Sequence, residues 1–379
     1  KESMTAYIGF DPTASSLHVG SLLPIMGLAR LQRFGHHAIA LVGGGTGLIG
    51  DPSGKTAERQ LLTKEKVQEN LDGIKNQLSH FLDFEAEGNP ARIENNLDWL
   101  GELQLIDFLR DTGKHFTVNY MLSKESVKRR IEAEDGISYT EFTYMMLQAY
   151  DFLALSRRRG CNLQLGGSDQ WGNILAGTDL IRRADSKKAH GLVFPLVTNS
   201  SGTKFGKTES GTVWLDPERT SPYRFYQFWM NTDDRDVIPY LKYFTWLGRE
   251  EIEALESEFN ENPGARTAQR TLAQHATTLV HGAAEYEKAL VASKVLFGGS
   301  LEAMTVADLK DIFEDVPSTT LSSASLSDGG MGLLSLCTET GITGSNGEAR
   351  RLIRQGGLFI NNERVVDENA AFTSDDLIE

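Results

Sequence analysis

The sequence predicts an α/β fold in which helices cover a parallel sheet. Residues 5–10 and 37–42 are short apolar runs typical of buried strands, and residues 17–34 between them carry apolar side chains at helical spacing. A strand–helix–strand order of this kind is typical of parallel sheets. Beyond about residue 220 the pattern changes to successive helical segments, near 221–231, 233–245, 249–258, 262–281 and 283–295.

The remaining elements divide the chain into four parts. Helices are predicted near 64–83, 103–111, 139–158 and 170–184, and strands at 162–165 and 192–197. The predicted parts are an α/β domain at 1–219, a helical domain at 220–315, a Ser/Thr/Asp-rich linker at 316–330 and a small α+β segment at 331–379. In that last segment a basic helix at 349–355 precedes a hairpin.

Composition narrows the class of protein. The chain has 379 residues, a net charge of −14 and only two cysteines, so a disulfide framework is not expected and a reducing, cytoplasmic compartment fits. No run is apolar enough to span a membrane. The acidic balance argues against broad nucleic-acid binding. Local basic clusters leave it possible at particular surfaces: 128–130, 157–159, 182–188 and 350–354. Lys1 directly precedes a strand, so we expect native N-terminal residues to be missing.

A first candidate phosphate site lies where the helix at 17–34 begins. His18-Val19-Gly20-Ser21 precedes its apolar stretch, and helix N-termini present N–H groups and a positive dipole end to anions. Gly20 allows close approach of a nucleotide, and His18 could donate to a phosphate oxygen. The alternative is an ordinary helix start with an incidental histidine.

Two familiar glycine motifs do not fit their usual sites. The run 45–50 matches G-x-G-x-x-G, but Asp51-Pro52-Ser53-Gly54 follows where that fingerprint needs a helix. The run 50–56 resembles a P-loop with three residues between its glycines in place of four. We interpret 50–59 as a glycine-rich site loop that carries Asp51, Lys55 and Arg59.

A second candidate phosphate site is the loop 202–208. Lys204 and Lys207 stand three residues apart among Gly, Ser and Thr, and such loops can close over a ligand. Two ammonium groups could neutralise charge on a leaving pyrophosphate. An ordinary solvated turn is the alternative.

A polar stripe marks the predicted helix 139–158. Tyr144, Gln148 and Asp151 fall at i, i+4 and i+7, on one face of an otherwise apolar helix. Buried polar groups need partners, so this stripe faces either solvent or a ligand pocket.

Together these motifs resemble a known family. His18–Ser21 and Lys204–Thr208 resemble the two signature sequences of class I aminoacyl-tRNA synthetases. Residues 7–18, 40–54, 139–152, 163–173 and 205–214 are similar to the bacterial-type tyrosyl-tRNA synthetases. The similarity covers nearly the whole chain. It implies a Rossmann-like catalytic domain, a helical domain and a small α+β S4-like RNA-binding segment.

The resemblance assigns roles to individual residues. Tyr7 and Asp151 would bind the phenol hydroxyl of tyrosine, since a carboxylate acceptor requires a donor that phenylalanine lacks. The rest of the tyrosine site would be Asp51, Tyr144 and Gln148 around the α-ammonium group and Gln170 near the carboxylate. ATP would contact Gly9, Asp11, His18, Gly20, Ser21, Gly167, Asp169, Leu196 and Val197. The polyphosphate would meet Thr13, His18, Lys55, Arg59, Lys204, Lys207 and Thr208.

The implied reaction has two steps. Tyrosine attacks the α-phosphorus of ATP and releases pyrophosphate, and the tyrosyl group then passes to tRNA-Tyr. Mg²⁺ would accompany ATP, largely water-bound, with no protein-bound metal site and no organic cofactor. The resemblance also implies a homodimer in the cytoplasm, with no membrane association.

The chain departs from the family pattern in a few places. Ser21 replaces a common second histidine and Ile8 a common cysteine, and Pro24 fits a helix only within its opening turn. In the S4-like segment, Arg350, Arg351 and Arg354 could face RNA phosphates on one helix. The chain ends before the basic strand of that module, so we expect the module to be incomplete.

Three alternatives stay open on sequence. The nearest is a tryptophanyl-tRNA synthetase, which has the same fold and signatures, although Tyr7 and Asp151 favour a phenol ligand. The second is an RNA-binding protein without catalysis, which the intact Asp51, Lys204 and Lys207 disfavour. The third is a small-molecule nucleotidyltransferase, which leaves the helical and S4-like segments unexplained.

Overall fold

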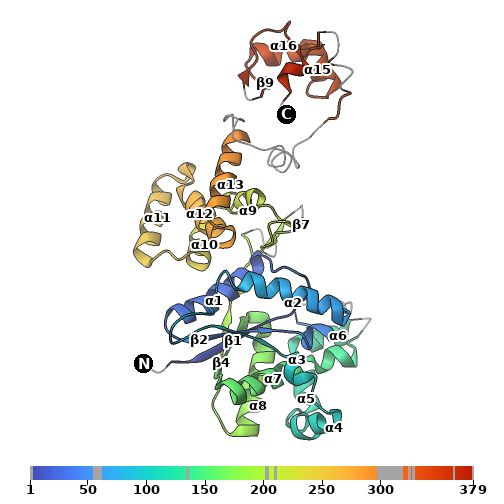
Figure 1. The fold of residues 1–379 in the computed structure, drawn as a ribbon, viewed down its shortest axis with the longest axis vertical. Helices are drawn as coiled ribbons and strands as arrows, with labels where there is room; N and C mark the ends of the chain where they lie inside the picture. The colour runs from blue at the N-terminus through green and yellow to red at the C-terminus, as the bar shows by residue number, and fades with distance from the viewer. Residues whose placement is uncertain are drawn as a thin grey trace. The chain divides into compact units, whose positions relative to one another are not determined.

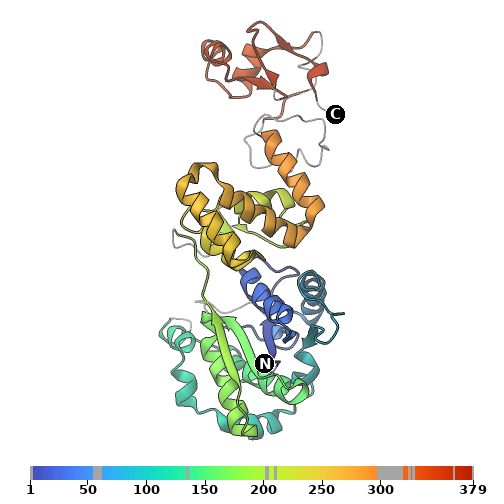
Figure 2. The ribbon, with the colours of Figure 1, turned by 90° about the vertical axis from the view of Figure 1, so that its left-hand side faces the viewer.

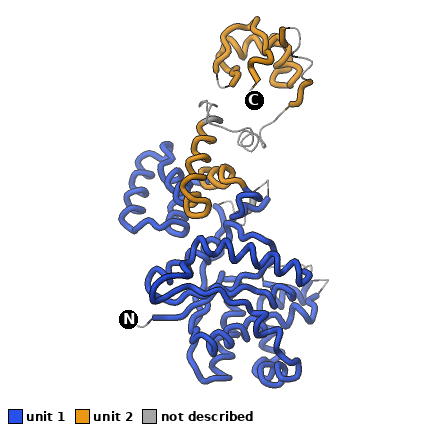
Figure 3. Tube along the Cα trace, viewed as in Figure 1, with its two compact units in different colours: residues 1–220, 232–275 blue, residues 221–231, 276–379 orange. Residues whose placement is uncertain are grey.

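The computed structural model describes residues 3–53, 62–133, 136–200, 205–208, 211–296, 319–322, 326, 329–361 and 363–377. The chain forms two compact units (Figure 3). The first comprises Lys1–Thr220 and Thr232–His275, and the second comprises Ser221–Asn231 and Ala276–Glu379.

The first unit is built on a five-stranded sheet. Its strands are β1 (Thr5–Phe10), β2 (His37–Val42), β3 (Arg92–Asn95), β4 (Leu163–Gly167) and β5 (His190–Phe194). Their order is β3-β2-β1-β4-β5 and every neighbouring pair is parallel. The order reverses between β1 and β4, and ligands of open parallel sheets bind outside the carboxyl ends of the strands at such a point.

Helices cover both faces of this sheet (Figures 1 and 2). On one face lie α1 (Leu22–Arg33) and α2 (Lys64–Leu78), and on the other lie α7 (Tyr139–Arg159) and α8 (Trp171–Asp185). Tyr7 points to the α7 side, where its ring packs 5.3 Å from that of Phe152. The polar stripe of α7 is therefore held against the central strand.

Short helices and turns complete the first unit. Between β3 and α7 these are α3 (Leu97–Leu100), α4 (Leu105–Asp107), α5 (Val118–Leu122) and α6 (Glu125–Glu132). After β5 comes an antiparallel pair of short strands, β6 (Lys207–Thr208) and β7 (Gly211–Thr212). The helices α10 (Val237–Phe244) and α11 (Arg249–Glu261) follow. The helix α12 (Thr267–His281) begins in the first unit and ends in the second, since the boundary falls after His275.

The second unit contains helices and a small α+β part. Its helices are α9 (Pro222–Met230), α13 (Ala283–Leu296), α15 (Leu333–Glu339) and α16 (Asn346–Arg354), and its antiparallel strand pairs are β8 (Met331–Gly332) with β11 (Ala371–Phe372) and β9 (Phe359–Ile360) with β10 (Glu363–Arg364). Arg350, Arg351 and Arg354 are exposed on α16, and Arg354 pairs with Glu368 at 3.0 Å.

The fold confirms the predicted α/β class and corrects several element boundaries. Prediction and structure agree at residues 5–10 and 37–42. The strand predicted at 192–197 is instead His190–Phe194, because Pro195 has no N–H to continue the ladder. The helix predicted near 103–111 is α-helical only over Leu105–Asp107 and continues as a π-type turn. Pro24 lies in the opening turn of α1. The first N–H groups of a helix have no intrahelical acceptor, so a proline at this position costs no helical hydrogen bond.

Candidate active site

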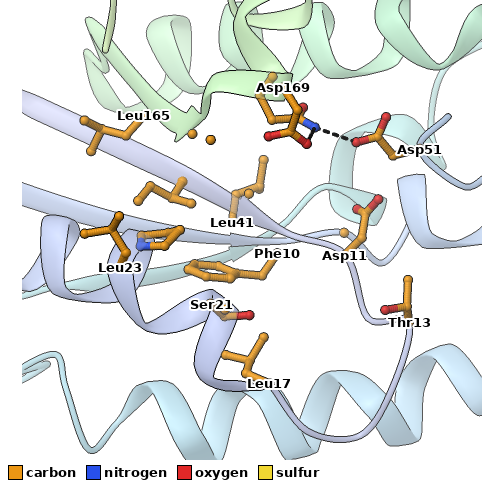
Figure 4. A pocket seen from close by; sticks show the side chains of 18 of the residues that line it. Phe10, Asp11, Thr13, Leu17, Ser21, Leu23, Leu41, Asp51, Leu165 and Asp169 are labelled. Atoms are coloured by element: carbon orange, nitrogen blue, oxygen red, sulfur yellow. Dashed lines mark hydrogen bonds between the residues drawn. The ribbon is translucent and has the colours of Figure 1, made fainter. Parts of the chain in front are cut away.

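A cavity of about 390 Å³ opens at the carboxyl ends of β1 and β4. Figure 4 shows the carboxylates of Asp11, Asp51 and Asp169 on one side of it and apolar Leu23 and Leu165 at the other end. The cavity brings together most of the residues predicted for the site. The predicted residues that line it are Tyr7, Gly9, Asp11, Thr13, His18, Gly20, Ser21, Asp51, Tyr144, Gln148, Asp151, Gly167, Asp169, Gln170, Leu196 and Val197.

The residues predicted at the polyphosphate lie partly outside the described part of the chain. Lys55, Arg59 and Lys204 lie outside the described residues. For Lys207 and Thr208 the structure describes the backbone, as strand β6. Their roles at the polyphosphate stay predictions from sequence.

Asp151 is buried beneath the cavity, with 2% of its surface exposed. Its Oδ1 accepts a hydrogen bond of 2.7 Å from Trp99 Nε1, and its Oδ2 accepts one of 3.0 Å from Asn96 Nδ2. Burial raises the pKa of Asp151 to about 7, although these two hydrogen bonds act in the opposite direction. The carboxylate is thus held in one orientation before any ligand binds.

Tyr7 shares the buried end of the cavity with Asp151. Its hydroxyl oxygen is buried and has no hydrogen-bond partner among the described residues. Burial raises the pKa of Tyr7 well above 10, and the nearby charge of Asp151 adds to this. The hydroxyl is therefore neutral at physiological pH. A buried hydroxyl without a partner costs free energy, so this end of the cavity favours a ligand with a hydrogen-bonding group.

A chain of hydrogen bonds links this end to the loop after β1. Asn96 Nδ2 also donates to Thr46 Oγ1 at 2.9 Å, and Thr46 Oγ1 donates to Asp11 Oδ1 at 2.8 Å. The hydroxyl of Tyr144 donates to the other oxygen of Asp11 at 2.7 Å. Each polar group of this buried network fixes the next, as preorganised sites require.

A second network lies across the cavity, around Gln170. Its Nε2 donates to Asp51 Oδ2 at 2.8 Å, and its Oε1 accepts from Gln148 Nε2 at 3.2 Å. Asn173 Nδ2 in turn donates to Gln148 Oε1 at 2.9 Å. Of the four residues predicted around the amino-acid head group, Gln170 therefore contacts Asp51 and Gln148 directly, and Tyr144 belongs to the network of Asp11.

His18 caps the helical turn that precedes α1. Its Nδ1 accepts from the backbone N–H of Gly20 at 3.0 Å. A neutral imidazole that accepts at Nδ1 carries its proton at Nε2, so His18 has a donor suited to a phosphate oxygen. A Cβ at residue 20 would lie 2.7 Å from His18 Cε1 and 2.8 Å from Nδ1, which explains the glycine there.

The first signature segment pairs through the backbone with the chain that follows the second, at residues 213–215. Val19 N donates to Val213 O at 3.0 Å, and Leu215 N donates to Leu17 O at 2.9 Å. His18 and Trp214 form the bridge between these bonds. The chain that follows the predicted lysine loop is thus paired with the chain that carries His18.

Phe205, in the middle of the predicted loop 202–208, packs into the first unit. Its ring stacks on Phe244 of α10 at 5.2 Å and meets Tyr240 edge-on at 5.0 Å. Phe205 is buried and lines the cavity.

Sequence reasoning missed Asn96 and Trp99, the partners of Asp151. Both follow β3, an edge strand that was not predicted because Arg92–Asn95 reads Arg-Ile-Glu-Asn and lacks an apolar run. The signal that could have found Asn96 is its position at the carboxyl end of a parallel strand. That signal depends on recognising β3 first.

Comparisons with known proteins identify the family of the chain. Residues 1–298 match the family model described as tRNA synthetases class I (W and Y), and residues 308–379 match the tyrosine–tRNA ligase SYY-like C-terminal domain. The tyrosine–tRNA ligase of Roseiflexus castenholzii is 58% identical over 379 residues, which are 100% of this chain and 89% of the relative. That of Geobacillus stearothermophilus is 56% identical with the same two coverages.

Solved structures agree on the fold. A C-terminally truncated mitochondrial tyrosyl-tRNA synthetase from Aspergillus nidulans is similar with a TM-score of 0.71 and 33% identity, over 78% of this chain and 86% of that one. A tryptophanyl-tRNA synthetase from Encephalitozoon cuniculi has a TM-score of 0.53 at 13% identity, over 82% of this chain and 83% of that one, a likeness of fold alone.

The fold, the cavity and the family match define the chain as a class I aminoacyl-tRNA synthetase of the tryptophan and tyrosine group. Within that group, the tyrosine–tRNA ligases named above match this chain along its whole length. Its C-terminal segment matches the C-terminal domain of tyrosine–tRNA ligases. The chain belongs to the tyrosine–tRNA ligase family.

Proposed function

We propose that the cavity binds tyrosine with its phenol hydroxyl between Tyr7 and Asp151. The observation that carries this assignment is that the Tyr7 hydroxyl, buried and without a partner among the described residues, lines the same cavity as a carboxylate held by Asn96 and Trp99. The tyrosine hydroxyl would donate to Asp151 and accept from Tyr7. Phenylalanine would leave both groups unpaired in the interior, which is strongly unfavourable.

The head group of tyrosine would lie at the network around Gln170. Asp51 supplies a negative charge for the α-ammonium group, and Gln148 and Tyr144 supply oxygen acceptors beside it. Gln170 would contact the carboxylate side of the amino acid. Its existing hydrogen bonds to Asp51 and Gln148 would orient it before the substrate arrives.

ATP would occupy the more open part of the cavity. Gly167 ends β4 and Asp169 lies in the helical turn that follows, and both would meet the ribose. Leu196 and Val197 would contact the adenosine. Thr13 and the Nε2–H of His18 would donate to phosphate oxygens. The basic residues Lys55, Arg59, Lys204 and Lys207, with Thr208, complete the polyphosphate site on the strength of sequence. Mg²⁺ would enter with ATP, held by phosphate oxygens and water.

The two-step reaction then follows from alignment and charge stabilisation. A carboxylate oxygen of tyrosine attacks the α-phosphorus of ATP. The bond between the α-phosphorus and the oxygen that bridges it to the β-phosphorus breaks, and pyrophosphate leaves with the electron pair. Tyrosyl-adenylate remains. A ribose hydroxyl at the 3′ end of tRNA-Tyr next attacks the tyrosyl carbonyl carbon and displaces AMP. No protein nucleophile takes part.

We further propose that the enzyme is a cytoplasmic homodimer that binds tRNA partly through α16. Large apolar side chains of α4, α5 and α7 are exposed in the first unit, namely Leu105, Ile106, Val118 and Tyr139, each with more than 60% of its surface accessible. Exposed apolar groups of this kind mark association surfaces.

Arg350, Arg351 and Arg354 would meet tRNA phosphates. Within the described residues, no helix has the length and apolar character needed to cross a bilayer.

Amino-acid-dependent exchange of pyrophosphate into ATP tests the substrate. The purified chain should exchange with tyrosine and not with tryptophan or phenylalanine. Exchange with tryptophan alone would show that the enzyme activates tryptophan and not tyrosine.

The dimer is tested separately by sedimentation, where Tyr139→Asp should shift the protein toward a monomer.

A further inference from the structure

We propose that Asn70, Gly73 and Gln77 of α2 are positioning residues for the ATP-binding loop 12–17. This inference rests on the proposed function, because it treats the neighbouring Thr13 and His18 as the groups that meet the phosphates. The three α2 residues follow one another at i, i+3 and i+7 and therefore share one helix face.

Polar side chains of α2 hold both ends of the loop. Asn70 has 1% of its surface exposed, and its Nδ2 donates to the carbonyl oxygen of Pro12 at 2.8 Å. Gln77 Oε1 accepts from the backbone N–H of Leu17 at 2.8 Å, and its Nε2 donates to Ser16 Oγ at 2.9 Å. One fixed point thus lies beside Thr13 and the other beside His18.

Gly73 brings the middle of the loop against the helix. A methyl group at this position would collide with the carbonyl oxygen of Ser15. Since glycine in a helix interior costs about 1 kcal/mol relative to alanine, its presence in mid-helix is explained by this close approach. Ile74, the next residue, lines the cavity.

The packing of α2 does not depend on these contacts. Its apolar side chains Val67, Leu71, Ile74 and Leu78 are buried in the first unit. Asn70 and Gln77 instead direct their hydrogen bonds to the loop. Apolar residues therefore attach the helix, while the polar face and the glycine set the position of the loop.

Small displacements of the loop would matter for the reaction. Within the described residues, the backbone hydrogen bonds of this stretch are a local turn from Thr13 N to Asp11 O at 2.8 Å and the pairing of Leu17 and Val19 with residues 213–215. Between these points the contacts with α2 hold the chain. A misplacement of about 1 Å in a reacting geometry can lower the rate about 10²-fold.

The test compares matched substitutions on one helix. Asn70→Ala and Gln77→Ala remove the contacts, and Asn76→Ala and Gln68→Ala remove the same side chains from exposed positions of α2. Gly73→Ala adds the colliding methyl group while favouring the helix. For each variant we would measure kcat and KM in tyrosine-dependent pyrophosphate exchange, the Kd for tyrosine, and the melting temperature.

We expect the three loop-facing variants to lose about 10- to 100-fold in kcat for exchange while the Kd for tyrosine stays within twofold. The two control variants should behave as wild type. Equal kcat in all five variants, or a matching loss of tyrosine affinity, would overturn the positioning role. Absence of tyrosine-dependent exchange in the wild type would instead overturn the proposed function, so the two failures are distinguishable.

Discussion

The two ends of the cavity are constructed differently. At the end proposed to bind the amino acid, Asp151 is buried and its orientation is fixed by the side chains of Asn96 and Trp99. At the end proposed to bind the nucleotide, Thr13 and His18 lie on a loop and a helix start, and backbone pairing and α2 hold that chain in place. Selecting a ligand by a single hydroxyl requires buried hydrogen-bonding groups that are oriented before the ligand binds. Binding a polyphosphate instead requires hydrogen-bond donors spread over a larger and more open surface.

The largest expected effect follows from removing the acceptor at the amino-acid end. Asp151→Ala should lower kcat/KM for tyrosine activation by at least about 10³-fold, because it removes a charged hydrogen bond and leaves the donors of Asn96 and Trp99 unpaired. Pyrophosphate exchange measures the loss, and circular dichroism checks the fold. Activity near that of the wild type would show that tyrosine is selected elsewhere.

At the nucleotide end the effect should fall on the rate. His18→Ala removes one donor to the phosphates, and loss of one preorganised donor costs about 10²-fold or more in kcat. The Kd for tyrosine should stay nearly constant, in contrast to Asp151→Ala. A change in tyrosine affinity equal to the change in kcat would mean that the two ends do not act separately.

The pKa of Asp151, about 7, predicts a pH dependence confined to the amino-acid end. Tyrosine donates best to the ionised carboxylate, so its affinity should rise about tenfold per pH unit below 7 and level off above it. Titration of tyrosine binding between pH 5.5 and 8 tests this, with Asp151→Asn as a variant that should lack the slope.

The same pKa predicts a stability trend of opposite sign. Because the folded-state pKa lies above the ordinary value of 3.8, the folded protein holds this proton more tightly than the unfolded chain does. The stabilisation is complete below about pH 4 and is lost as the pH rises through 7. In Asp151→Asn the free energy of unfolding should lack this component.

The smallest expected effect concerns Tyr7. Tyr7→Phe removes one neutral hydrogen bond to the ligand, so kcat/KM for tyrosine should fall about two- to tenfold. The same change removes a buried hydroxyl without a partner among the described residues, so the melting temperature of the ligand-free protein should stay equal or rise. A drop in that melting temperature would indicate that the hydroxyl has a structural role.

Sequence patterns predicted the parts of the site that repeat with a regular period or carry a motif. The stripe of Tyr144, Gln148 and Asp151 was visible because helical spacing places the three on one face, and all three line the cavity. The helix start at His18 was likewise visible from its glycine and the apolar stretch that follows.

The supporting residues could not be predicted in this way. Asn96 and Trp99 follow a charged edge strand, and Asn70 and Gln77 lie on a polar helix that resembles any solvated one. Their importance comes from contacts across 55, 52, 58 and 60 residues of sequence. Periodicity reports which face of an element is buried, and it carries no information about such distant partners.

The bridge between His18 and Trp214 has a consequence for how the enzyme is made. These two segments are separated by nearly two hundred residues, so contacts of this range form late and slowly during folding. On the ribosome, an N-terminal portion that stops short of Val213 would hold the strands and the amino-acid pocket without the second half of its nucleotide site. The nascent chain should therefore acquire affinity for tyrosine before it acquires the ability to consume ATP.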